Sequence, residues 1–105
     1  EAGRFPFRFH EMGRWWHKGE EIDIVALNKE TREIAIFECK WSRVDEKRAE
    51  RILDSLKNKA PLLKWYNGKR KEYYGVVGKT IEGKENLREK GYLVFDLKDL
   101  ESVSF

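Results

Sequence analysis

The sequence predicts an α/β fold in which a central mixed β-sheet is flanked by helices, and three observations lead to this prediction. Two apolar runs of strand length, 21–27 and 34–41, are separated by a polar segment that suits a hairpin turn. The second run begins apolar on both faces, which is typical of a strand covered on both sides. Further along, segments with helical spacing alternate with strand-like segments. The 105 residues suffice for one small domain, 1–105, with a single core.

The first half of the chain is predicted to supply three strands. Phenylalanines alternate with Pro6 and Arg8 over residues 5–9, which predicts a first strand that the proline confines to a sheet edge. The runs 21–27 and 34–41 follow as two adjacent antiparallel strands.

The second half is predicted to add two helices and two strands. A helix over 44–59 is expected to begin at the N-cap Ser42 and to stop before Pro61. Its apolar stripe comprises Ala49, Ile52, Leu53, Leu56 and Ala60. The remaining elements are a strand over 72–78, a short helix over 85–90 that ends at Gly91, a strand over 92–96, and a terminal turn or short helix over 97–105.

Charged residues interrupt the two apolar runs. Side chains alternate faces along a strand, so Ile34, Ile36, Glu38 and Lys40 share one face, and Ala35, Phe37, Cys39 and Trp41 share the other. A charge next to buried apolar residues is costly without a partner. Asp23 lies between Ile22 and Ile24 in the neighbouring run. We therefore expect Asp23, Glu38 and Lys40 to converge at one end of the hairpin.

These three residues suit metal-assisted phosphodiester hydrolysis. Asp23 and Glu38 offer the hard oxygen ligands that Mg²⁺ or Mn²⁺ prefers, and the backbone carbonyl of Cys39 can add a third ligand. Lys40 would orient the attacking water or stabilise charge in the transition state. Taken singly, each residue is more often a solvated edge residue or a member of an ion pair.

Asp23 followed by Glu38-x-Lys40 after an apolar strand resembles the motif of the PD-(D/E)XK nuclease superfamily, although Ile22 stands where that motif has proline. A longer pattern, in the segments 13–16, 20–26 and 38–41, is similar to the nuclease-like domain of unknown function at the C-terminal end of a family of archaeal and bacterial AAA-type ATPases. This resemblance covers roughly residues 10–60.

The resemblance implies a restriction-endonuclease-like fold whose first helix lies before Glu1, so that the chain is the C-terminal part of a larger one. It implies a Mg²⁺-dependent DNA endonuclease attached to an ATPase domain in the same chain or complex. Asp23, Glu38 and Lys40 would then be catalytic, and Asp23, Glu38 and Cys39 would bind the metal. Enzymes of this fold often act as dimers, so a homodimer is also implied.

Four cations are candidate contacts to nucleic acid. Arg14 adjoins Trp15 and Trp16, which could form a stacking platform for an unpaired base. The alternative is that one tryptophan caps the core and the other supports the hairpin. Lys69, Arg70 and Lys71 form a basic cluster at a predicted loop, where phosphate contacts are often found, although such clusters are usually only solvated.

Composition limits the type of organism, the kinds of binding site and the cellular compartment that we expect for this domain. Charged residues make up 39% of the chain, rich in Lys and Glu, which is typical of proteins from hyperthermophiles. The net charge of +3 permits nucleic-acid binding without arguing for it. A single cysteine excludes an internal disulfide, and with two histidines it cannot complete a structural zinc site. No apolar run is long enough to span a membrane and no leader opens the chain, so we expect a soluble, cytoplasmic domain.

Two other functions stay open at this stage. The domain could be a catalytically inactive module that kept the fold and docks on an ATPase or on nucleic acid. It could also be a purely structural oligomerisation domain that uses its exposed Trp and Phe residues.

Overall fold

The structure is a computed structural model that describes residues 5–101. Its centre is a five-stranded mixed sheet in the order β1-β2-β3-β4-β5, in which β1, β2 and β3 are antiparallel and β3, β4 and β5 are parallel. The strands are β1 (Glu11–His17), β2 (Glu20–Asn28), β3 (Glu33–Val44), β4 (Lys71–Ile81) and β5 (Leu93–Phe95). The predicted mixed sheet and the central position of the 34–41 strand are confirmed.

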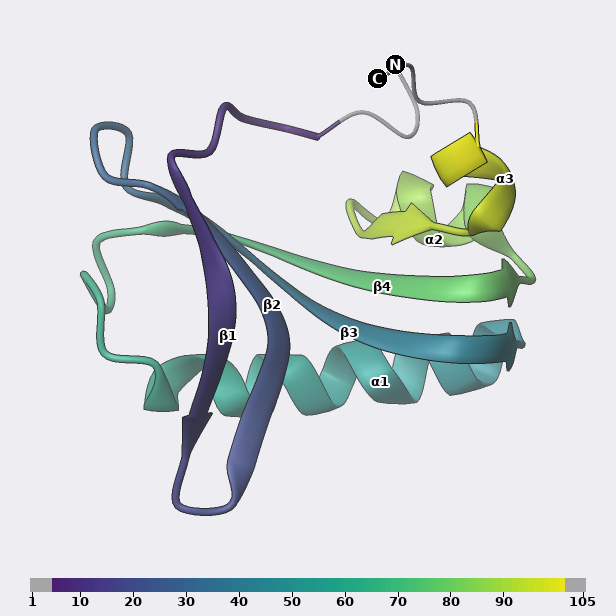
Figure 1. Ribbon diagram of the computed structural model, residues 1–105, viewed down its shortest axis with the longest axis horizontal. Helices are drawn as coiled ribbons and strands as arrows, with labels where there is room; N and C mark the ends of the chain where they lie inside the picture. Colours follow the sequence, from purple (N-terminus) through teal and green to yellow (C-terminus); the bar gives the residue numbers. More distant parts are fainter. Residues whose placement is uncertain (1–4, 102–105) are drawn as a thin grey trace.

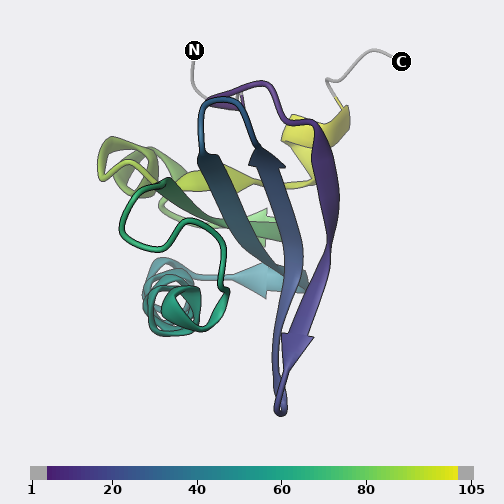
Figure 2. The ribbon, with the colours of Figure 1, turned by 90° about the vertical axis from the view of Figure 1, so that its left-hand side faces the viewer.

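The helices are α1 (Glu46–Lys59), α2 (Lys84–Glu89) and α3 (Leu97–Glu101), with a 3₁₀ turn η1 (Ala60–Leu62) after α1. Helix α1 connects the parallel strands β3 and β4, as such a pair requires. Figure 2 shows α1 and α2 on the same side of the sheet. The described residues contain no helix that is long and apolar enough to cross a membrane.

The main core lies between the sheet and α1. The predicted stripe of α1 is confirmed, because Ala49, Ile52, Leu53 and Leu56 are buried. They pack with residues of the sheet, among them Ile22, Val25, Ile34, Ile36, Val76 and Val94. Burial of this kind stabilises each large aliphatic side chain by roughly 1.5–3 kcal/mol, so this layer fixes β2, β3 and β4 against the helix.

The predicted first strand over 5–9 is wrong, because the first strand begins at Glu11. The Phe5, Phe7 and Phe9 rings gather instead, with Phe5 5.1 Å from each of the other two. Phe5 also lies 5.9 Å from Phe37 of β3, and Phe7 lies 5.4 Å from Tyr73 of β4. The N-terminal segment therefore packs its rings over the sheet, where Phe37 would otherwise face water, rather than extending the sheet.

The predicted N-cap of the long helix is also wrong. Asp45 caps α1, and its side chain accepts a hydrogen bond from the Arg48 N–H at 2.8 Å. Ser42 still belongs to β3, which pairs with β4 as far as Val44. The end of α1 before Pro61, the short helix near 85–90 and a short helix after Leu97 are confirmed within one residue at the ends that can be compared. Residues 102–105 of the last segment lie outside the described residues.

Candidate functional site

The predicted convergence point lies where β2 and β3 separate. The two strands pair only from Ile24 and Phe37 to Asn28 and Glu33. Beyond that point β3 continues beside β4, whereas the first half of β2 runs with β1 toward the free end of their hairpin (Figure 1). We call this divergence the fork, and its residues are Asp23, Glu38, Cys39 and Lys40. The predicted site residues therefore come together at the end of the β2–β3 pairing.

An irregularity in β2 sits at the fork. Gly13 of β1 pairs with Val25, and Trp15 pairs with Ile22, so that Asp23 and Ile24 together stand opposite the single residue Arg14. This is the pattern of a β-bulge, which bends a strand and redirects its side chains. As a result Ile22 and Val25 both belong to the main core although they are three residues apart.

The Asp23 carboxylate bridges the fork. Its Oδ2 accepts a hydrogen bond from the backbone N–H of Cys39 at 2.9 Å; Asp23 is one residue and Cys39 two residues beyond the last strand pair, Ile24 with Phe37. A carboxylate acceptor makes this bond stronger than one between neutral groups. Within residues 5–101 the other oxygen, Oδ1, has no hydrogen-bond partner. Asp23 thus joins the diverging strands through Oδ2 alone.

Glu38 and Lys40 lie next to this bridge on β3. Alternation puts both on the side where Ile34 and Ile36 pack against α1. The Lys40 Nζ and the Glu38 Oε2 are 3.9 Å apart, and their side chains are 39% and 21% exposed. A separation of this size makes a loose ion pair, so both groups can turn toward a ligand.

The pKa of the Cys39 thiol reflects the negative charge at the fork. Burial raises its pKa, and the negative charges of Asp23 and Glu38 raise it further. Both carboxylates are therefore close enough to the Cys39 thiol to affect its pKa, and the thiol stays protonated near neutral pH.

The donor set at the fork fits a hard divalent cation better than zinc. It consists of the Asp23 and Glu38 carboxylates and the backbone carbonyl oxygen of Cys39, and it contains no histidine. In the part of the chain that the structure describes, no three side chains of His, Cys, Asp or Glu gather closely enough to hold a metal by themselves. A cation here would take Asp23 and Glu38 and complete its shell with water, as Mg²⁺ commonly does.

The four predicted nucleic-acid contacts differ in exposure. Arg14 is 61% exposed and pairs with Glu21 at 3.2 Å. Lys69 is exposed in the loop, and Lys71 is exposed at the start of β4 with its ammonium over the Tyr73 ring. The Arg70 side chain is only 2% exposed and pairs with Glu72 at 2.8 Å. Arg70 therefore cannot present its guanidinium to a phosphate.

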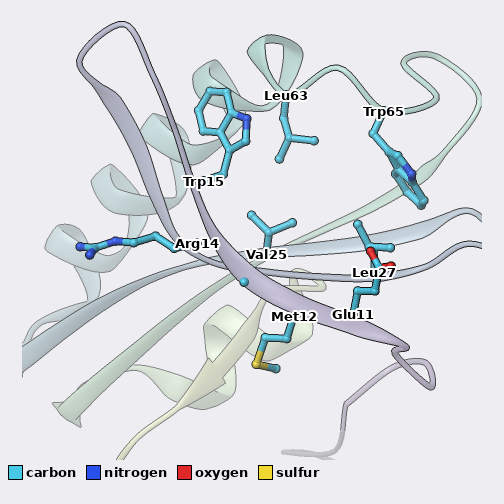
Figure 3. A pocket seen from close by; sticks show the side chains of 9 residues that line it. Glu11, Met12, Arg14, Trp15, Val25, Leu27, Leu63 and Trp65 are labelled. Atoms are coloured by element: carbon cyan, nitrogen blue, oxygen red, sulfur yellow. The ribbon is translucent and has the colours of Figure 1, made fainter.

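A pocket of about 290 Å³, which the sequence did not reveal, lies on the α1 side of β1 and β2. Its lining comprises apolar residues and two charged ones: Met12, Gly13, Trp15, Val25, Leu27, Leu63, Trp65, Glu11 and Arg14. Figure 3 shows Trp15 rising from β1 and facing Leu63 and Trp65 of the loop after α1. Trp15 is half-buried and packs against the core, whereas Trp16 is 71% exposed. The signal in the sequence was the tryptophans themselves, but only the fold shows that Trp15 and the distant Trp65 line the same pocket.

The chain is similar to several known proteins. Residues 1–52 match a family described as archaeal and bacterial proteins of unknown function. An uncharacterized protein of Methanocaldococcus jannaschii is 40% identical over 99 residues, which are 94% of this chain and 21% of that protein. The chain thus spans about a fifth of that relative's length.

A solved structure, a repair endonuclease from Pyrococcus abyssi, aligns with 83% of this chain and 38% of its own. The two chains are 17% identical, and the TM-score is 0.47.

Proposed function

We propose that the fork is the site of a Mg²⁺-dependent nuclease that hydrolyses phosphodiester bonds in DNA. The observation that carries the proposal is the hydrogen bond from the Cys39 N–H to Asp23 Oδ2. It holds a carboxylate of β2 beside Glu38 and Lys40 at the point where the strands separate and the sheet opens.

Each residue has a distinct role in this proposal. Asp23 and Glu38 would hold the divalent cation, with the Cys39 carbonyl as a further ligand. When bound, that cation would lower the pKa of a water and neutralise charge on the scissile phosphate. Lys40 would orient the attacking water, or would donate to the phosphate oxygen on which charge develops. The loose contact between Lys40 and Glu38 leaves the ammonium able to make that move.

The test is cleavage of single- and double-stranded DNA by the purified chain with Mg²⁺ or Mn²⁺, compared with Asp23→Asn, Glu38→Gln and Lys40→Gln. Asparagine keeps an oxygen that can accept the Cys39 N–H, so Asp23→Asn removes the charge while sparing the bridge. We expect each variant to lose at least about 100-fold in rate while its melting temperature stays close to that of the wild type. Cleavage that persists unchanged in all three variants would refute the proposed roles.

The second candidate is a non-catalytic module that docks on an ATPase domain of the same chain or complex. Trp16 on β1 and Trp41 on β3 are 71% and 66% exposed, and they favour this candidate because exposed aromatic residues are common at protein interfaces. Calorimetric titration of Mn²⁺ into the wild type and into Glu38→Gln separates the two candidates. Binding that is lost in the variant supports the nuclease, and no binding to either protein supports the docking module.

A further inference from the structure

We infer that the pocket between Trp15 and Trp65 is a stacking site for one unpaired nucleobase of the nucleic acid whose backbone lies at the fork. The inference rests on the proposed function only in taking a nucleic acid as the ligand. It adds the requirement that this nucleic acid present a base outside a duplex.

The walls of the pocket are suited to a flat ring. Two indole rings and the side chains of Val25, Leu27 and Leu63 line it. Stacking on aromatic side chains is the usual way in which proteins hold unpaired bases, because every base presents a π-face. The volume of about 290 Å³ lies just below the range for drug-sized ligand pockets, roughly 300–1,000 Å³. A single ring system therefore fits, whereas a stack of several bases does not.

The pocket is open next to β1 because residue 13, which is part of its lining, is a glycine. Gly13 pairs with Val25 and alternates with Trp15, so a side chain at this position would rise on the pocket side of β1. Among the described residues other than its two chain neighbours, no atom lies within 4 Å of the place that a Cβ on Gly13 would occupy. The space that a ligand ring would fill is thus in contact with the backbone of β1.

The wall that carries Leu63 and Trp65 is held in place before any ligand arrives. The Arg70 guanidinium donates to the carbonyls of Leu63 and Trp65, each at 2.8 Å, and to that of Ala60 at 2.7 Å. The Asn67 side chain accepts from the Trp65 N–H at 2.8 Å. These bonds fix the loop, so a ring can enter without a large entropic cost of ordering the wall.

Charge around the pocket favours a polyanion. Arg14 lines the pocket, Lys64 lies between the lining residues Leu63 and Trp65 in the chain, and Lys29 pairs with Glu11, which is also part of the lining. The Lys59 ammonium donates to the Glu21 carbonyl, and the Glu21 carboxylate pairs with Arg14. Arg14 also stands opposite Asp23 and Ile24 in the bulge. A base in the pocket and a phosphate at the fork would therefore contact neighbouring residues of β2. This proximity favours a nucleic acid over an uncharged aromatic ligand.

The experiment compares two fluorescein-labelled probes in EDTA, where no cleavage takes place. One is a short oligothymidylate, and the other is an oligomer of equal length whose sugars carry no bases. We expect the wild-type chain to bind the oligothymidylate more tightly, by fluorescence anisotropy. Gly13→Val fills the pocket, and we expect it to weaken this binding roughly 5- to 150-fold, which corresponds to the stacking of one base. The affinity for the baseless oligomer should stay the same.

Met12→Val is the matched control: Met12 also lines the pocket, but its side chain points to the opposite side of β1 from Trp15 and Leu63 (Figure 3), so a valine there leaves the space between them open. It should bind both probes like the wild type. Valine favours a strand, so Gly13→Val should keep its circular dichroism and melting temperature. Should Gly13→Val nevertheless unfold, Trp65→Ala removes a wall of the pocket and must show the same loss.

Equal affinity of the wild type for both probes would overturn the inference. So would full affinity of Gly13→Val and Trp65→Ala for the oligothymidylate, which would assign the pocket to another occupant such as an aromatic side chain of a partner protein. A chain that binds as expected but never cleaves DNA would refute the nuclease and leave the base site standing. If Gly13→Val cleaves DNA as well as the wild type, the base site is refuted and the nuclease stands.

Discussion

Arg70 holds the loop between α1 and β4 through a buried guanidinium. Its nitrogens donate to three backbone carbonyls, and its Nε donates to the Glu72 carboxylate at 2.8 Å. The Ala60 carbonyl also accepts from the Leu63 N–H, and the Glu72 carboxylate also accepts from the Tyr74 hydroxyl. The Leu63 and Trp65 carbonyls therefore depend most on Arg70, which donates to four acceptors at once.

Arg70→Met should therefore lower the free energy of unfolding by about 3 kcal/mol, because it removes the donor to the Leu63 and Trp65 carbonyls and the cation that pairs with Glu72. Urea denaturation followed by circular dichroism measures the loss. Lys69→Met is the matched control in the exposed neighbour, and its effect should stay within about 0.5 kcal/mol. Equal effects of the two substitutions would show that the Arg70 contacts add nothing to stability.

The sequence shows three adjacent cations at 69–71 and offers no means of separating them. Which of the three is buried depends on which one reaches the carbonyls after α1. That contact joins residues up to ten positions apart, and only the folded loop creates it. For the same reason the pocket was missed, since Trp15 and Trp65 lie far apart in the chain. Asp23, Glu38 and Lys40 could be placed together because strand alternation and a hairpin are local rules.

At the scale of the elements, the junction between β3 and α1 shows two rules in competition. Ser42 and Asp45 are both good N-cap residues, and a helical start after Ser42 would satisfy local preferences. Strand β3 nevertheless stays extended to Val44, which pairs with Ile81 of β4 and is fully buried. Long-range pairing and burial thus postpone the helix until Asp45.

Asp45→Ala should destabilise the chain by about 1 kcal/mol, because the first turn of α1 loses its cap on the Arg48 N–H. Thermal unfolding measures the change. Ser42→Ala removes only a side-chain contact with Arg48 at 3.3 Å, and we expect a few tenths of a kcal/mol. A larger loss from Ser42→Ala than from Asp45→Ala would contradict this assignment of the cap.

The whole molecule is a sheet covered unequally on its two sides. Helices α1 and α2 cover one side, and the N-terminal segment covers part of the other (Figures 1 and 2). Asn28 ties that segment to the sheet, since its Nδ2 donates to the Arg8 carbonyl at 2.6 Å. The same side chain accepts from the N–H groups of Glu30 and Thr31 in the β2–β3 turn. One buried amide therefore joins the hairpin to the start of the described chain.

Asn28→Ala should lower the free energy of unfolding by about 2–3 kcal/mol, because it leaves one carbonyl and two N–H groups without this partner. It should also increase hydrogen exchange in residues 5–10 and in the turn together. Asn86→Ala, at an exposed side chain with one long contact to Glu46, should cost under about 0.5 kcal/mol. Exchange that rises in the turn alone would show that Asn28 does not secure the N-terminal segment.

The order of the elements from β2 onward could be predicted because each long element there has a clear apolar pattern. The first strand could not, since three alternating phenylalanines satisfy a strand pattern equally well when their rings form a cluster above a sheet. Packing on Phe37 and Tyr73 decides between the two arrangements, and that information lies in residues far along the chain.

The bulge in β2 makes the fork sensitive to chain length as well as to residue type. Ile22 reaches the core because one extra residue separates it from Val25. Loss of a single codon at Asp23 or Ile24 would restore regular alternation and leave the apolar layer able to pack. Deletion of Asp23 would remove the bridge to Cys39, and deletion of Ile24 would turn the Asp23 side chain away from Cys39. Among natural relatives, single-residue deletions here would therefore separate folded chains that keep the site from folded chains that have lost it.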